Sequence, residues 1–156
     1  MDRVLPKFPI EKYAVSDPLG DGTYGNVFSY KIRKGDSTLP DKVAVKVFQP
    51  KHASSFFREK ENIEAVMVND HPNIVKCLGI CQPLVGKHAL VFEVFDCDLM
   101  DYMCREGTAC SNAKSRNILY QIAKALEHMH RVKRVHRDVK PDNVLVKVLE
   151  DDQMKV

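Results

Sequence analysis

One short polar loop constrains this chain more than any other feature. The loop runs from His136 to Asn143 and holds a carboxylate, a lysine two residues later and a carboxamide three residues after that. Apolar residues precede it over 118–129 and follow it over 144–146, as in a core-facing helix and a short strand. An acid, a base and an amide between two core elements indicate a site for chemistry, with an ordinary polar turn as the plainer alternative.

Three glycines near the N-terminus, Gly20, Gly22 and Gly25, have G-x-G-x-x-G spacing. The spacing alone indicates little, because dinucleotide-binding folds also use it. In those folds a helix follows the glycines directly, whereas residues 27–32 alternate and are rich in β-branched and aromatic types. The pattern therefore favours a glycine-rich hairpin between two strands, either a phosphate-binding one or a plain flexible one.

A lysine, Lys46, lies inside the β-branched run of residues 43–48. On an edge strand such a lysine simply faces solvent. After a glycine-rich hairpin, however, it has a second interpretation. The hairpin, the Val-Ala-Val-Lys strand and the H-R-D-x-K-P-x-N fragment at 136–143 together resemble the protein kinase family.

Further residues narrow the resemblance. Lys140 is typical of serine/threonine kinases, and Phe92-Glu93 followed by Asp98-Leu99 is most similar to the cyclin-dependent and mitogen-activated branch. The implied fold is α+β with two lobes. An N-lobe antiparallel sheet with one αC-type helix would cover residues 13–95, and the first helices and catalytic loop of a C-lobe would cover 96–156. Residues 1–12 would be an extended N-terminal lead-in.

The resemblance implies transfer of phosphate from ATP, with Mg²⁺, to Ser or Thr hydroxyls of protein substrates. Asp138 would orient the substrate hydroxyl and accept its proton. Lys140 would steady the transferred group with its charge, and Asn143 would offer an amide oxygen to the metal. Lys46 would pair with the α- and β-phosphates.

The same resemblance implies a nucleotide site. Phe92 would be the gatekeeper, Glu93 and Phe95 would supply hinge backbone contacts, and Leu145 would lie beneath the adenine. Asp98 would reach the ribose, although it is equally a good helix N-cap. The residues expected to contact the nucleotide are Gly20, Asp21, Gly22, Thr23, Tyr24, Gly25, Val27, Ala44, Lys46, Phe92, Glu93, Phe95, Asp98 and Leu145.

The glutamate partner of Lys46 is ambiguous in the sequence. Kinases place it on the helix that here spans about 54–69, where Phe56, Ile63, Val66 and Met67 form an apolar stripe. Three glutamates are available, Glu59, Glu61 and Glu64. Counting back from the His-Pro-Asn segment at 71–73, the commonest spacing lands on Asn62, which would leave the lysine unpaired and activity in doubt. We predict Glu61, which needs one extra residue in the turn; alternatively all three glutamates lie on a solvated face.

The composition indicates in which compartment the protein works and which classes of partner it binds. Lys and Arg exceed Asp and Glu by only 24 to 21, too small a surplus to imply nucleic acid. Five cysteines without C-x-x-C spacing indicate free thiols in a reducing compartment. No signal-peptide pattern opens the chain, and its longest nearly apolar run, 89–95, is too short to span a bilayer. We expect an intracellular protein of the cytoplasm or nucleus. Its expected partners are a protein substrate and an activating protein, and we expect it to bind neither nucleic acid nor a membrane.

The resemblance stops before the D-F-G motif. Residues 150–156 resemble the turn and strand that lead to it, so the resemblance covers the first half, or slightly more, of a kinase domain. The Asp of that motif is the principal Mg²⁺ ligand. We therefore expect this polypeptide alone to be inactive or nearly so. The alternative function is a nucleotide-binding, regulatory or decoy fragment without catalysis.

Overall fold

The structure, a computed structural model, describes residues 4–22, 25–33, 38–106, 111–149 and 154–156. It forms two compact units. The N-terminal unit comprises Met1–Val68 and Lys76–Val94, and the C-terminal unit comprises Asn69–Val75 and Phe95–Val156. Because each unit has apolar clusters of its own, each is described separately.

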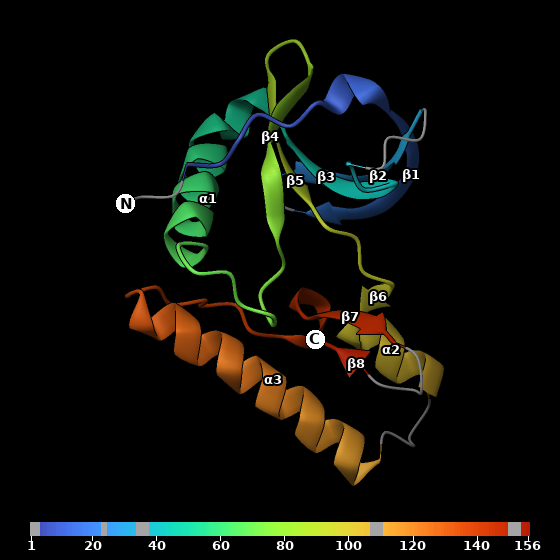
Figure 1. The fold of residues 1–156 in the computed structure, drawn as a ribbon, viewed down its shortest axis with the longest axis vertical. Coiled ribbons are helices and arrows are strands. Elements are labelled where there is room, and N and C mark those ends of the chain that lie inside the picture. Colours follow the sequence, from blue (N-terminus) through green and yellow to red (C-terminus); the bar gives the residue numbers. More distant parts are fainter. Residues whose placement is uncertain (1–3, 23–24, 34–37, 107–110, 150–153) are drawn as a thin grey trace. The chain divides into compact units, whose positions relative to one another are not determined.

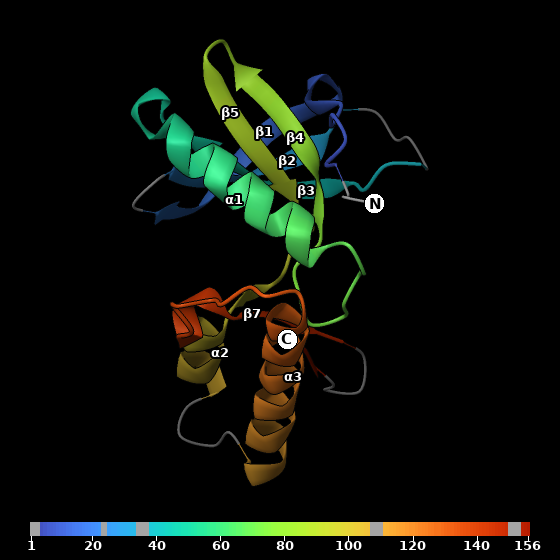
Figure 2. The ribbon, with the colours of Figure 1, turned by 90° about the vertical axis from the view of Figure 1, so that its left-hand side faces the viewer.

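The N-terminal unit is an antiparallel sheet covered by a helix. Its strands are β1 (Tyr13–Gly22), β2 (Gly25–Ile32), β3 (Lys42–Phe48), β4 (Cys77–Leu84) and β5 (Lys87–Phe92), in the spatial order β1-β2-β3-β5-β4 (Figure 1). Helix α1 (Ala53–Val66) crosses the sheet and contacts β3 and β5 (Figure 2). Two 3₁₀ turns, η1 (Ile10–Lys12) and η2 (Pro50–His52), precede β1 and α1. The α+β class expected from the sequence is confirmed.

Strand β3 separates two clusters because its side chains alternate between the faces of the sheet. Its odd-numbered valines point into the first, the sheet cluster, which consists of Phe8, Tyr13, Val43, Val45, Val47, Cys81, Ala89 and Val91. On the other face, α1 closes the second, the helix cluster, which consists of Leu5, Phe48, Phe56, Met67, Cys77 and Leu90. Ala44 and Lys46 alternate with the valines and so face the side of α1.

One predicted boundary differs from the observed one. Helix α1 ends at Val66, where the N–H of Met67 donates to Ile63 as the C-cap, rather than near residue 69. Strand β4 begins at Cys77. Just before it, Lys76 donates its N–H to the Glu93 carboxylate (2.9 Å) and accepts from the Glu93 N–H (3.1 Å).

The C-terminal unit combines a small sheet with two helices. The sheet has the order β6-β7-β8, formed by β6 (Cys97–Asp98), β7 (Leu145–Val148) and β8 (Met154–Lys155). The helices are α2 (Leu99–Glu106) and α3 (Asn112–Arg131), and the 3₁₀ turn η3 (Pro141–Asn143) precedes β7. Their core, the lower cluster, consists of Leu99, Tyr102, Ile118, Val146, Met154 and Val156.

Short polar side chains begin both helices of this unit. The Ser111 hydroxyl accepts from Lys114 N–H (3.3 Å) as the N-cap of α3, and the Asp98 carboxylate accepts from Asp101 N–H (2.8 Å) at the start of α2. None of the helices in the described part of the chain has the length and apolar composition needed to cross a bilayer.

Candidate active site

Lys46 in β3 forms an ion pair with Glu59 of α1. The ammonium nitrogen lies 2.8 Å and 2.7 Å from the two carboxylate oxygens, and it also sits 5.2 Å from the centre of the Phe48 ring. Both side chains are partly shielded, with 25% and 30% of their surfaces exposed. The pair therefore fixes the lysine on the α1 side of the sheet while leaving part of it open to a ligand.

The prediction that Glu61 pairs with Lys46 is wrong. In the structure Lys46 contacts Glu59, and Glu61 is exposed. Successive helical residues turn by about 100°, so Glu61 points to nearly the opposite side from Glu59. The signal that identifies Glu59 was present in the sequence. It lies three residues after Phe56 and four before Ile63, on the apolar stripe that faces the sheet. Counting from the His-Pro-Asn segment misses this, since it assumes a fixed loop length.

Four of the predicted nucleotide residues share one face of the sheet. Val27 is directly opposite Lys46 across β2–β3, and Phe92 is opposite Ala44 across β3–β5. Cross-strand partners point to the same face, and residues two apart on a strand do too. Val27, Ala44, Lys46 and Phe92 therefore lie together on the face that carries the ion pair. Phe92 packs partly buried against the helix cluster.

The glycine-rich motif forms the β1–β2 hairpin. Gly20 is paired with Val27, Asp21 with Asn26 and Gly22 with Gly25. The backbone of β3 comes so close to residue 25 that only glycine fits there, because a Cβ would collide with the Val47 carbonyl. A strand follows the glycines, as the sequence predicts. The predicted contacts at Thr23 and Tyr24 lie outside the described residues.

The polar loop of the C-terminal unit holds its acid and amide in contact. The Asn143 side-chain amide donates to the Asp138 carboxylate (2.8 Å) and to the Asp138 carbonyl (2.9 Å). His136 accepts from the Asp138 N–H at 3.3 Å, and Arg137 has a positive φ of 68°. Asp138, Lys140 and Asn143 are all exposed. The loop thus presents an oriented carboxylate with a lysine nearby in the chain.

The remaining predicted contacts are placed as follows. Asp98 and Leu145 are cross-strand partners in β6–β7, and the Asp98 carboxylate caps α2. The Glu93 N–H donates to the Lys76 carbonyl (3.1 Å). The backbone group of Glu93 that could bond the adenine is therefore its carbonyl. Phe95 belongs to the C-terminal unit, with the Lys155 ammonium 5.2 Å from the centre of its ring.

A model of the protein kinase domain matches residues 13–156. The chain belongs to the protein kinase family. The matched range includes the hairpin, the Lys46–Glu59 pair and the Asp138–Asn143 loop of this kinase-family chain.

Its curated relatives include cyclin-dependent and mitogen-activated kinases, as the sequence predicts. Cyclin-dependent kinase F-3 of Oryza sativa subsp. japonica is 34% identical over 88% of this chain and 31% of its own length. Cell division control protein 2 homolog 3 of Trypanosoma brucei brucei is 33% identical over 96% of this chain and 47% of its own length. Mitogen-activated protein kinase 15 of Xenopus laevis is 33% identical over 87% and 23%. The chain thus spans less than half the length of each of these relatives.

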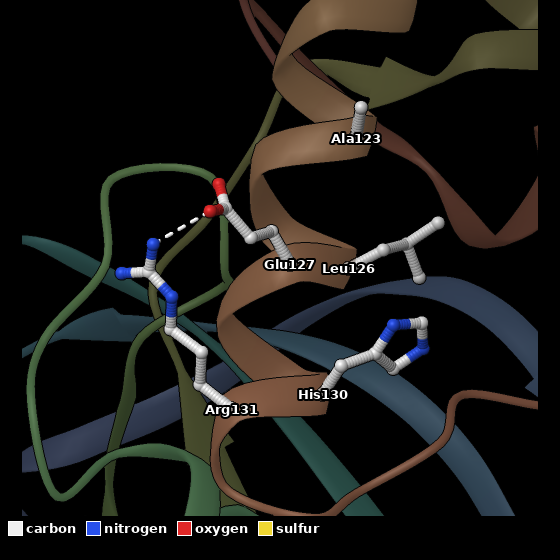
Figure 3. A pocket seen from close by; sticks show the side chains of 5 residues that line it. All are labelled: Ala123, Leu126, Glu127, His130 and Arg131. Atoms are coloured by element: carbon white, nitrogen blue, oxygen red, sulfur yellow. Dashed lines mark hydrogen bonds and ion pairs between the residues drawn. The ribbon is translucent and has the colours of Figure 1, made fainter.

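A depression on α3 is lined by none of the predicted site residues. Figure 3 shows its lining, Ala123, Leu126, Glu127, His130 and Arg131, all from one helix, with Arg131 bonded to Glu127 at 2.6 Å. Within the described ranges no three His, Cys, Asp or Glu side chains gather as they would around a metal ion. His128 packs against His71, with ring centres 5.0 Å apart. The depression carries no catalytic group of the family.

Proposed function

We propose that the kinase domain to which these residues belong transfers a phosphoryl group from ATP to Ser or Thr hydroxyls of protein substrates. The Lys46–Glu59 ion pair carries this proposal. The sequence left open whether Asn62 occupies the glutamate position, in which case the lysine would have no partner. With Glu59 in contact, Lys46 has the partner that phosphate binding requires in this family.

The proposed steps follow from the chemistry of each side chain. Lys46 attracts the α- and β-phosphates as a positive charge held in place by Glu59. Asp138 accepts the proton of the substrate hydroxyl, with its carboxylate oriented by the Asn143 amide. Lys140 supplies a second charge near the transferred group. Because the transition state is largely dissociative, such positioning and charge neutralisation provide most of the catalysis.

Mg²⁺ would be held at Asn143. Its amide nitrogen is occupied by two bonds to Asp138, so the amide oxygen, the type of ligand that this hard cation prefers, is the atom available for it. A single amide oxygen does not hold Mg²⁺ alone, and protein sites for this ion share it with substrate phosphates. When bound, the ion supplies neutralisation of phosphate charge.

Lys46→Met tests the nucleotide site. We expect Mg-ATP to raise the melting temperature of the protein and Lys46→Met to remove most of the rise, because the phosphates lose their cation. Lys42→Met is the matched control, since Lys42 lies on the same strand and is exposed. An equal rise in wild type and Lys46→Met would contradict this placement of the phosphates.

The transfer step needs its own measurement. In a complete kinase domain that contains these residues and a D-F-G motif, phosphate should be incorporated into a basic protein substrate. Asp138→Asn in that domain should abolish the incorporation, because it keeps the shape of the side chain but loses the base. The alternative, an inactive nucleotide-binding or regulatory protein, predicts the thermal shift without incorporation.

A further inference from the structure

The N-terminal run Val4–Phe8 is bound to the domain rather than extending freely from it. Leu5 and Phe8 are 3% and 5% exposed, whereas Val4 beside them is 73% exposed. The family match begins only at residue 13, so membership of the kinase family does not account for these contacts. Figure 1 shows the run passing along α1 and crossing to β4.

The backbone of the run is joined to β4, the end strand of the sheet. The Phe8 N–H donates to the Ile80 carbonyl (2.8 Å), and the Ile80 N–H donates to the Pro6 carbonyl (2.9 Å), forming a parallel bridge centred on Lys7. Gly79 makes this approach possible, since a Cβ at residue 79 would lie 2.5 Å from the Pro6 carbonyl oxygen. The run therefore covers an edge that would otherwise be open.

The start of the same run is joined to α1. Leu5 is a member of the helix cluster, with Phe56 and Met67. Its N–H donates to the Glu64 carboxylate (2.8 Å), and Lys60 holds the same oxygen at 2.6 Å. Glu64, which the sequence left as a candidate for the ion pair, thus has a different role. It connects the helix to the N-terminal run.

We infer that residues Leu5–Phe8 form a strap that sets the position of α1 on the sheet, and thereby the contact of Glu59 with Lys46. Glu59 and Glu64 are five residues apart on one helix, about 7.5 Å along its axis, so a rigid helix transmits a shift at one to the other. Leu5 and Glu64 are positioning residues that act through Glu59. An effect of the strap on catalysis rests on the proposed function. Its effect on the Lys46–Glu59 contact does not depend on that function.

The test measures the reactivity of Lys46 toward an amine-acylating reagent, by mass spectrometry and without nucleotide. Loss of the Leu5 hydrogen bond in Glu64→Ala should raise the labelling rate of Lys46 about threefold or more, since hydrogen bonds to charged groups are the stronger kind. The labelling rate in Glu64→Gln should stay near that of the wild type, because the amide oxygen of glutamine still accepts from Leu5.

The Leu5 side chain is tested in the same way. Leu5→Ala should raise the labelling rate of Lys46, whereas Val4→Ala, at the exposed neighbour, should not. Glu59→Gln gives the rate for the broken pair.

A destabilised control separates positioning from stability. Val43→Ala weakens the sheet cluster on the other face; it should lower the melting temperature and leave Lys46 labelling unchanged. If Glu64→Ala and Leu5→Ala behave like Val43→Ala, the strap only stabilises and the inference is overturned. Unchanged labelling in Glu59→Gln would overturn it as well. ATP binding is measured separately, so its absence in the wild type would refute the proposed function while leaving the labelling comparison valid.

Discussion

Glu59 and Glu61 are two residues apart on α1 and have different surroundings. Glu59 contacts Lys46 with both oxygens, while Glu61 faces solvent. We predict that Glu59→Gln weakens Mg-ATP binding about tenfold, equivalent to ~1.4 kcal/mol, because the lysine loses the charge that orients it. Glu61→Gln should leave affinity unchanged. Isothermal titration of both variants checks this, and equal losses would indicate a general effect of helix charge.

Gly25 gives a second prediction at this scale. A Cβ at residue 25 would collide with the backbone of Val47, which cannot rotate away, whereas one at Gly20 meets nothing within 4 Å. Gly25→Ala should therefore lower the free energy of unfolding by about 1–3 kcal/mol. Gly20→Ala should cost much less. Urea denaturation of the two variants gives the comparison, and similar losses would show that the β2–β3 contact adapts.

The position of the polar loop and the place of Lys46 on a strand were predictable from the sequence, whereas the choice among the three glutamates was wrong. The loop can be located from the sequence because five or more of its positions match the H-R-D-x-K-P-x-N motif together. The glutamate depends on helix rotation, which loop counting does not give. The apolar stripe, through Phe56 and Ile63, does give it.

Among the elements, α3 and the segment before β4 meet through two imidazole rings, His71 and His128. Burial lowers the pKa of His71, and the charges of His128 and Lys124 lower it further, against an opposing effect of Glu127. A histidine whose pKa is depressed on folding binds fewer protons folded than unfolded, so stability is full above the unfolded pKa and declines as pH falls below it.

The stability of the C-terminal unit should therefore decrease as pH falls from about 7 towards 5. His71→Asn should flatten this part of the profile, because asparagine does not titrate there and its side chain can still accept from the Asn73 N–H, as His71 does at 3.2 Å. Hydrogen exchange of α3 amides across this pH range is the measurement. His130→Asn, exposed on the same helix, is the control. A slope that persists in His71→Asn would assign it to other groups.

Element types were predicted better than element ends or the lead-in. The alternating and helical patterns correctly indicated β2, β3 and α1, because apolar periodicity reports which face is buried. The bound N-terminal run was not predicted. Leu5 and Phe8 are single apolar residues among prolines and charges, and no periodicity distinguishes them from an exposed tail. The run is bound at the edge of β4, where Phe8 contacts Ile80, which is 72 residues later in the chain.

The molecule as a whole has separate cores in its two units. Leu90 is fully buried in the helix cluster, and Ile118 is buried in the lower cluster. Leu90→Ala and Ile118→Ala should each cost about 2–5 kcal/mol in their own unit, because each leaves a cavity. Hydrogen exchange should show the loss in β3 and β5 for the first variant and in α3 and β7 for the second. Uniform loss over both units would mean that they unfold together.

The α+β class and kinase-family membership follow from motifs that span the chain, and both are confirmed. The unit boundary was less accessible to sequence reasoning. Residues 69–75 join the C-terminal unit although they precede β4, through Asn73, which donates to Gln121 of α3 (2.7 Å) and to the Val156 carbonyl (2.8 Å). A polar side chain in a loop gives no periodic signal of such partners.

The alternation along β3 has a consequence for how this protein can change. Val43, Val45 and Val47 face the sheet cluster, and Ala44 and Lys46 face the side of the ion pair. In a library of all single substitutions, odd positions should therefore limit how much folded protein accumulates, and even positions should limit activity at normal abundance. Inserting or deleting one residue within the strand would exchange the two sets, placing an ammonium in the core and a valine against Glu59. Length variation in this lineage should accordingly be excluded from β3 and confined to the connections on either side.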